Sequence, residues 1–125
     1  MDELVEWLRA QLDEDERTAR AAGSDVWRRQ DHPSDTVAVY DLKGEPVVYD
    51  EGWPTEAQQA HIAAHDPARV LREIDAKRDL LRFAEGVHDH HATFTTGVAS
   101  RLEATLRLFA AAYVDRPGYR DEWRP

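Results

Sequence analysis

Residues 36–49 read TVAVYDLKGEPVVY, and this stretch decides the fold class because it interrupts a sequence that is otherwise helical in its periodicity. Thr36–Tyr40 alternates β-branched residues with a period of two, which is typical of a strand. Gly44 is available for the left-handed position of a hairpin loop, and Pro46–Tyr49 is the return strand. A proline cannot donate a ladder hydrogen bond, so this return strand should lie at a sheet edge or begin at Pro46.

Working outward, Val26–Arg29 is predicted as a first strand, and residues 31–35 have turn chemistry. The three strands therefore predict an antiparallel meander, which is too small to be stable alone and must lie on helices. Apolar spacing and capping signals predict helices on both sides of it, over residues 3–22, from 56 to the Asp66-Pro67 break, from Pro67 to about Gly86, and over 98–114.

The expected fold class is α+β, with an N-terminal helix, a small three-stranded antiparallel meander, and helices packed on one face. We expect one domain over residues 1–125, divided into 1–54 (acidic helix and meander), 55–114 (helical part) and 115–125 (tail). Residues 87–97 could be a loop or a continuation of the preceding helix. The tail has too many helix breakers to be α-helical, but its aromatic residues indicate that it docks.

The 125 residues include 25 Asp and Glu against 16 Lys and Arg, giving a formal charge of −9, and no cysteine. The lack of cysteine excludes disulfides, thiol catalysis, iron–sulfur clusters and cysteine zinc sites. Residues 1–54 hold 14 acids and 6 bases, a net of −8, so residues 55–125 carry only −1. An acidic chain argues against direct nucleic-acid binding. The one basic cluster, over residues 69–82, is interleaved with acids and is predicted to form ion pairs along a solvated helix face.

The N-terminal residues are acidic where a signal peptide would be basic, and no apolar run approaches the length of a membrane helix. We therefore expect a cytoplasmic protein without a membrane span.

Two groups of histidines could bind metal. His61 and His65 have the i,i+4 spacing that places two imidazoles on one helix face, and Asp66 follows them. The alternative is structural, with His65 at the C-terminal end of its helix and His61 packed or facing water. The second group comprises His88, His90 and His91 with Asp89. Neither pattern is a complete metal motif, and no nucleophile, phosphate-loop or other cofactor motif occurs, so no other cofactor is expected.

The candidate interaction residues are the acidic run Asp13, Glu14, Asp15 and Glu16, and the aromatic Trp123 near the C-terminus. The acidic run could bind a basic partner, or it could be a solvent face balanced by Arg17 and Arg20. Aromatic residues such as Trp123 can anchor interfaces, although core packing is their commoner role.

Residues 60–78, AHIAAHDPARVLREIDAKR, and 119–125, YRDEWRP, resemble a family of short uncharacterised proteins of actinobacteria, their prophages and their phages, catalogued as a domain of unknown function. Residues 23–27 depart from the Thr-Pro-Gly-Pro-Trp type of sequence that the family commonly has there. The resemblance implies a phage or prophage context and carries no activity.

Together these features favour a non-enzymatic accessory protein that binds an unidentified protein partner, with homodimerisation through the long helices as one form. A more specific form is an anti-defence inhibitor or acidic DNA mimic. The alternative is a small metal-dependent enzyme or metal-binding protein centred on His61 and His65.

Overall fold

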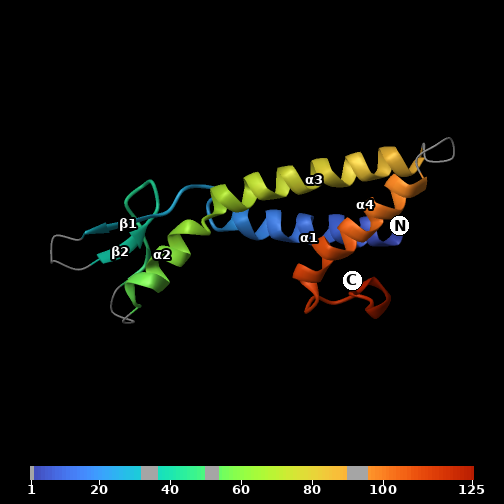
Figure 1. Cartoon of the computed structure of the whole chain (residues 1–125). Helices are drawn as coiled ribbons and strands as arrows, with labels where there is room; N and C mark the ends of the chain where they lie inside the picture. The colour runs from blue at the N-terminus through green and yellow to red at the C-terminus, as the bar shows by residue number, and fades with distance from the viewer. Residues whose placement is uncertain (1, 32–36, 50–53, 90–95) are drawn as a thin grey trace. The chain divides into compact units, whose positions relative to one another are not determined.

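The computed structural model describes residues 2–31, 37–49, 54–89 and 96–125, and its elements follow the predicted order of helix, three strands and further helices (Figure 1). The α+β fold class is therefore confirmed. The elements are α1 (Asp2–Ala21), β1 (Arg28–Asp31), β2 (Val37–Tyr40), β3 (Pro46–Val48), α2 (Glu56–Ala64), α3 (Pro67–Asp89), α4 (Thr96–Ala110), and the 3-10 turns η2 (Ala111–Tyr113) and η3 (Asp121–Trp123).

The chain divides into two compact units. Unit 1 comprises Met1–Glu14 with Asp75–Pro125, and unit 2 comprises Asp15–Ile74. Their boundaries fall inside α1 and α3, whereas the sequence patterns placed the internal boundary at residues 54/55. Unit 1 joins two segments that are distant in sequence, whereas unit 2 is one continuous segment. The expectation of a single domain over the whole chain stays a prediction.

Unit 2 contains the sheet, whose antiparallel strands lie in the order β1-β2-β3. Strand β3 is at an edge and begins at Pro46, as the missing proline N–H requires. The first strand was predicted two residues too early. The reason is that the N–H of Val26 donates to Asp25 Oδ1 and that of Trp27 donates to Asp66 Oδ2, so neither joins the ladder.

The β2–β3 loop is held by the side chain of Asp41. Its Oδ1 accepts the N–H groups of Lys43 and Glu45, both at 2.9 Å, and Gly44 has a φ of 82°. The predicted left-handed glycine is therefore confirmed, and its surroundings are an Asx-type turn. Central residues Ala38 and Val39 are buried, and α2 is the helix that packs on β1 and β2.

The predicted starts of α2 and α3 are confirmed. Thr55 Oγ1 accepts the N–H of Gln58 at 3.0 Å, and Gln58 Oε1 accepts that of Thr55 at 2.8 Å, which completes the capping box of α2. Asp66 Oδ1 accepts the N–H of Arg69 at 2.8 Å and so caps α3 ahead of Pro67.

Helix α3 extends past Gly86 to Asp89, and α4 begins at Thr96, two residues before the predicted start. Of residues 87–97, which could have been a loop or a helix, 87–89 therefore continue α3 and 96–97 begin α4. Residues 90–95 lie outside the described residues. The last helix tightens into η2 after Ala110 instead of remaining α-helical to residue 114.

Unit 1 has its own core, formed by one face of α1 against residues of α3, α4 and the tail. Its most deeply buried side chains are Leu4, Val5, Leu8, Leu12, Leu81, Ala84, Leu106 and Ala110. The predicted stripe at helical spacing in α1 is therefore the buried one. The tail is docked as predicted, and the short turn η3 places Trp123 in this core with only 6% of its surface exposed.

Candidate functional site

The two histidines of α2 lie together at the C-terminal end of the helix. The capping box starts α2 at Glu56, and one helical turn then separates His61 from His65. Their rings are in tilted contact, with centroids 4.1 Å apart and planes inclined by 33°. Both side chains are exposed. His65 is also the C-cap residue, as the structural alternative expected, and its Nδ1 lies 2.8 Å from the carbonyl oxygen of His61.

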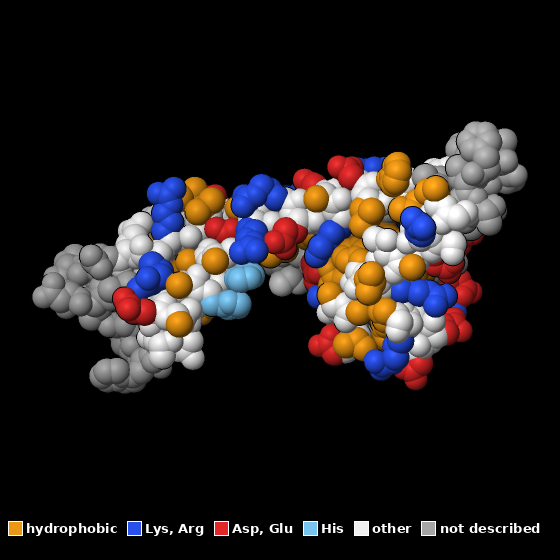
Figure 2. Space-filling view, viewed as in Figure 1, with side chains coloured by type: hydrophobic (Ala, Val, Ile, Leu, Met, Phe, Trp, Pro, Cys, Tyr) orange, Lys and Arg blue, Asp and Glu red, His pale blue; other side chains and the backbone are white. Residues whose placement is uncertain are grey.

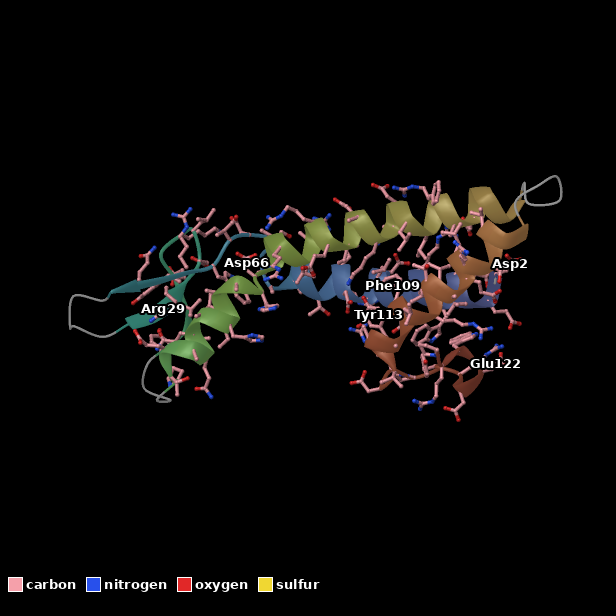
Figure 3. The ribbon with its side chains drawn as sticks, in the orientation of Figure 1. Asp2, Arg29, Asp66, Phe109, Tyr113 and Glu122 are labelled. Atoms are coloured by element: carbon pink, nitrogen blue, oxygen red, sulfur yellow. The ribbon has the colours of Figure 1, made fainter. Side chains whose placement is uncertain are left out.

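Asp66, the third predicted ligand, is directed elsewhere. It lies at the junction of α2 and α3 (Figure 3), where it is 8% exposed. Its Oδ1 accepts the N–H of Arg69, and its Oδ2 accepts the N–H of Trp27 at 3.2 Å. Asp66 therefore joins the strand entry to the start of α3. Within the described ranges, no group of three or more His, Cys, Asp and Glu residues is arranged to hold a metal ion.

The second histidine group cannot be placed in the same way. His90 and His91 lie outside the described residues, and the backbone of His88 and Asp89 belongs to the last turn of α3.

The predicted acidic run lies on α1, and its carboxylates already have partners within the chain. Asp13 Oδ1 accepts Arg78 Nη2 at 2.7 Å, while Glu16 Oε1 accepts Arg20 Nε at 3.2 Å. Glu14 and Asp15 also interact with other residues. Asp13 nevertheless keeps 72% of its side chain exposed. Exposed ion pairs contribute at most about 1 kcal/mol, so these acids could exchange their partners for a basic surface.

The basic cluster of α3 is paired as the sequence predicted. Arg69 binds Glu73 at 2.9 Å, and Arg82 binds Asp79. Lys77 has a different role, because its Nζ donates to Tyr113 Oη at 3.3 Å and lies 5.3 Å from the ring centroid of Phe109. Figure 3 shows these two aromatic residues at the end of α4 and in η2. The cluster thus combines local ion pairs, the ion pair of Arg78 with Asp13 of α1, and the cation–π contacts of Lys77 with Phe109 and Tyr113.

Trp123 is not an exposed anchor. Its ring centroid lies 5.4 Å from that of Trp7 and 5.9 Å from that of Tyr119. The indole N–H of Trp7 donates to the carbonyl oxygen of Pro117 at 3.0 Å, which ties the tail to α1. Arg120 binds Glu3 at 2.5 Å beside this aromatic cluster. The expectation that Trp123 is available to a partner does not fit this burial.

The ion pair between Arg9 and Glu85 in unit 1 was not predicted from the sequence, because the two residues are distant in the chain. Arg9 donates through Nη1 and Nη2 to the two carboxylate oxygens of Glu85, at 2.7 and 2.5 Å. This bidentate hydrogen bonding lowers the pKa of Glu85 below its ordinary 4.5 and raises the pKa of Arg9. Both side chains stay more than one-third exposed, so solvent limits the stabilisation to about 1 kcal/mol.

This pair should make the stability of unit 1 depend on pH. Because the pKa of Glu85 is lower in the folded state, its stabilisation is present above 4.5 and is lost as the pH falls through the folded-state pKa. A double-mutant cycle with Arg9→Gln and Glu85→Gln should give a coupling energy of up to about 1 kcal/mol at neutral pH, falling towards zero in acid. Urea denaturation at several pH values measures it. A coupling independent of pH would show that charge does not hold the pair.

In the part of the chain that the structure describes, no helix combines the length and the apolar composition that crossing a bilayer requires. No curated protein and no solved structure matches the chain. The profile of a family described as "Family of unknown function (DUF6221)" matches residues 1–125, and the chain therefore belongs to that family.

Proposed function

We propose that this chain is a non-enzymatic accessory protein of a phage or prophage that acts by binding another protein. The observation that carries the proposal is the apolar surface of α4, where Leu108 is 63% exposed and Val98 is 49% exposed. Figure 2 shows hydrophobic side chains gathered over the region that α4 occupies in Figure 1. Covering such side chains with a partner contributes about 25 cal/mol for each Å² of apolar surface removed from water. The phage context rests on the sequence resemblance alone.

A third exposed apolar side chain of the same unit supports this view. Phe83 on α3 is 61% exposed, and large exposed aromatics are favoured at protein interfaces. Trp7, Tyr113 and Trp123 form an aromatic cluster in unit 1, whereas the side chain of Phe83 stays exposed. A partner that offers an apolar groove with a polar rim fits these exposed side chains.

The test is affinity capture with the purified chain from a host lysate, followed by a binding measurement with the captured protein. The double variant Val98→Glu/Leu108→Glu should weaken binding by at least about tenfold, because each introduced carboxylate would have to be buried. Leu42→Glu is the matched control, since Leu42 is 54% exposed in unit 2. Equal binding by both variants would overturn the α4 surface as the interface.

The same binding measurement tests the more specific hypothesis that the chain is an acidic DNA mimic. The variant Asp13→Asn/Glu14→Gln/Asp15→Asn/Glu16→Gln removes the charges of the acidic run and leaves its size nearly unchanged. If the chain imitates DNA, this variant should lose binding, and binding by the unchanged chain should weaken steeply with salt. Retained binding would reject the mimic. If the partner is a second copy, light scattering should give about twice the 14.3 kDa chain mass.

A further inference from the structure

The histidine pair at the end of α2 has three properties that favour metal binding. The first is separation. Two nitrogens bound to one tetrahedral zinc ion at about 2.0–2.1 Å lie about 3.4 Å apart. Two imidazoles that bind one tetrahedral ion in their ring planes have centroids about 5 Å apart. The rings of His61 and His65, with centroids 4.1 Å apart, therefore need only a small outward rotation of these exposed side chains to bind one ion. Their spacing is fixed by one turn of a helix whose start is secured by a capping box, so both side chains lie on one helix face before any ion arrives.

The second property is the hydrogen bond that orients His65. A carbonyl oxygen only accepts, so the contact of 2.8 Å between His65 Nδ1 and the oxygen of His61 requires the proton to be on Nδ1. The Nε2 atom of neutral His65 then carries the free lone pair. Metal-binding histidines characteristically donate their other ring N–H to a carbonyl or carboxylate, which fixes the tautomer and the ring orientation. His65 has this arrangement within its own helix.

The third property is access. Both imidazoles are exposed, so an ion can enter without any rearrangement of the core. The nearby cation, Arg69, donates Nη1 to the oxygen of Ala64 at 3.1 Å and is balanced by Glu73 at 2.9 Å. Asp66 contributes no ligand because both of its oxygens accept backbone N–H groups. Among the residues of this unit that the structure describes, the ligand set is therefore the two imidazoles.

We infer that His61 and His65 form a two-histidine binding site for a late first-row divalent cation, with Zn²⁺ as the probe, whose remaining coordination positions are open to water. Imidazole ligands suit zinc, copper and nickel, and exclude the hard cations magnesium and calcium. This site is independent of the proposed α4 interface, which lies in the other unit. It requires no catalytic activity.

The experiment uses the tag-free full chain in which His88, His90 and His91 are replaced by glutamine, because that tract could bind zinc on its own. Titration calorimetry with zinc chloride should show one ion per chain bound in the micromolar range. Adding His61→Gln or His65→Gln should weaken binding by at least about tenfold. Far-UV circular dichroism should be unchanged, since both positions are exposed and glutamine is a good helix former.

A relocated pair provides the matched control. The variant His61→Ala/Ala64→His keeps two histidines in α2 but places them on adjacent residues, which do not face each other. It should bind zinc as weakly as the single variants. In nitrogen-15 spectra of the imidazoles, zinc should shift the Nε2 resonance of His65 and leave Nδ1 protonated. Binding only at millimolar zinc, equal binding by the relocated pair, or coordination through Nδ1 would each overturn the inference.

Discussion

Replacing Trp123 with alanine is expected to reduce the free energy of unfolding by about 3–5 kcal/mol, the usual cost of removing a large buried aromatic side chain. The indole is 6% exposed, and its ring packs against those of Trp7 and Tyr119, which also contact each other. Alanine would leave a cavity in the place where the tail joins α1. Urea denaturation followed by circular dichroism measures the loss.

Leu108→Ala is the control for this prediction. Leu108 is 63% exposed, so its truncation should change stability by no more than about 0.5 kcal/mol. The two variants therefore separate stability from binding. Trp123→Ala should act on folding, whereas Leu108 belongs to the surface proposed for a partner. If Trp123→Ala retained full stability, the indole would not be a core residue, and its role as an interface anchor would be restored.

The sequence predicted well the features that depend on a few neighbouring residues. The capping box of Thr55 and Gln58, the Asp66-Pro67 start of α3 and the left-handed Gly44 each follow from interactions that span at most a few positions. The apolar spacing of α1 also identified its buried face correctly. Local chemistry of this kind is visible in the order of the residues, because the groups that satisfy one another are close in the chain.

Contacts between distant residues were not predictable in the same way. Arg9 and Glu85 are 76 positions apart, and Trp7 and Pro117 are 110 apart. Many arginines and carboxylates in the sequence could have formed such a pair, and periodicity gives no preference among them. Trp123 illustrates the consequence. Its position in a breaker-rich tail allowed either a docked core residue or an exposed anchor, and its contacts with α1 determine which one it is.

In the candidate site, too, the local feature was predictable from the sequence and the long-range contact was not. The i,i+4 spacing was enough to predict that His61 and His65 share a helix face, and their rings lie together. The sequence could not show that Asp66 Oδ2 accepts a hydrogen bond from the N–H of Trp27, which is 39 positions away. Adjacent residues can therefore have unrelated roles once the backbone turns between them.

Folding also changes how the acidic charge is distributed. Along the chain, residues 1–54 carry −8 of the total −9. The compact units divide the same charge almost evenly, because unit 1 holds 13 acids and 9 bases, a net of −4, and unit 2 holds 12 and 7, a net of −5. Residues 75–125, which hold 8 acids and 8 bases, fall in the same unit as the acidic start of α1. A basic partner would therefore recognise individual faces such as the acidic run, and not an acidic half of the protein.

Gly118→Ala is expected to destabilise unit 1 by about 2–5 kcal/mol, for two separate reasons. The first is conformational, because Gly118 has a φ of 87°, in the left-handed region that costs other residues about 1–2 kcal/mol. The second is steric. A Cβ atom at this position would lie 2.8 Å from Trp7 Nε1 and 3.2 Å from its Cδ1. Overpacking of this kind typically costs about 1–3 kcal/mol.

Alanine substitutions at two other glycines distinguish the conformational contribution from the steric one. Gly44 has a φ of 82°, and a Cβ atom added there would meet none of the described residues beyond its chain neighbours within 4 Å, so Gly44→Ala should show the conformational cost alone. Gly86 lies inside α3 with similar open space, and Gly86→Ala should stabilise the helix by about 0.5–1 kcal/mol.

The indole of Trp7 cannot simply move aside, because its N–H donates to Pro117 and its ring packs against Trp123. Any relief of the overlap must therefore loosen the tail. Urea denaturation of the three glycine variants should rank Gly118→Ala as the most damaging and Gly86→Ala as neutral or favourable. A Gly118→Ala variant no less stable than Gly44→Ala would show that the tail does not approach Trp7 this closely, and the docking of residues 115–125 on α1 would have to be revised.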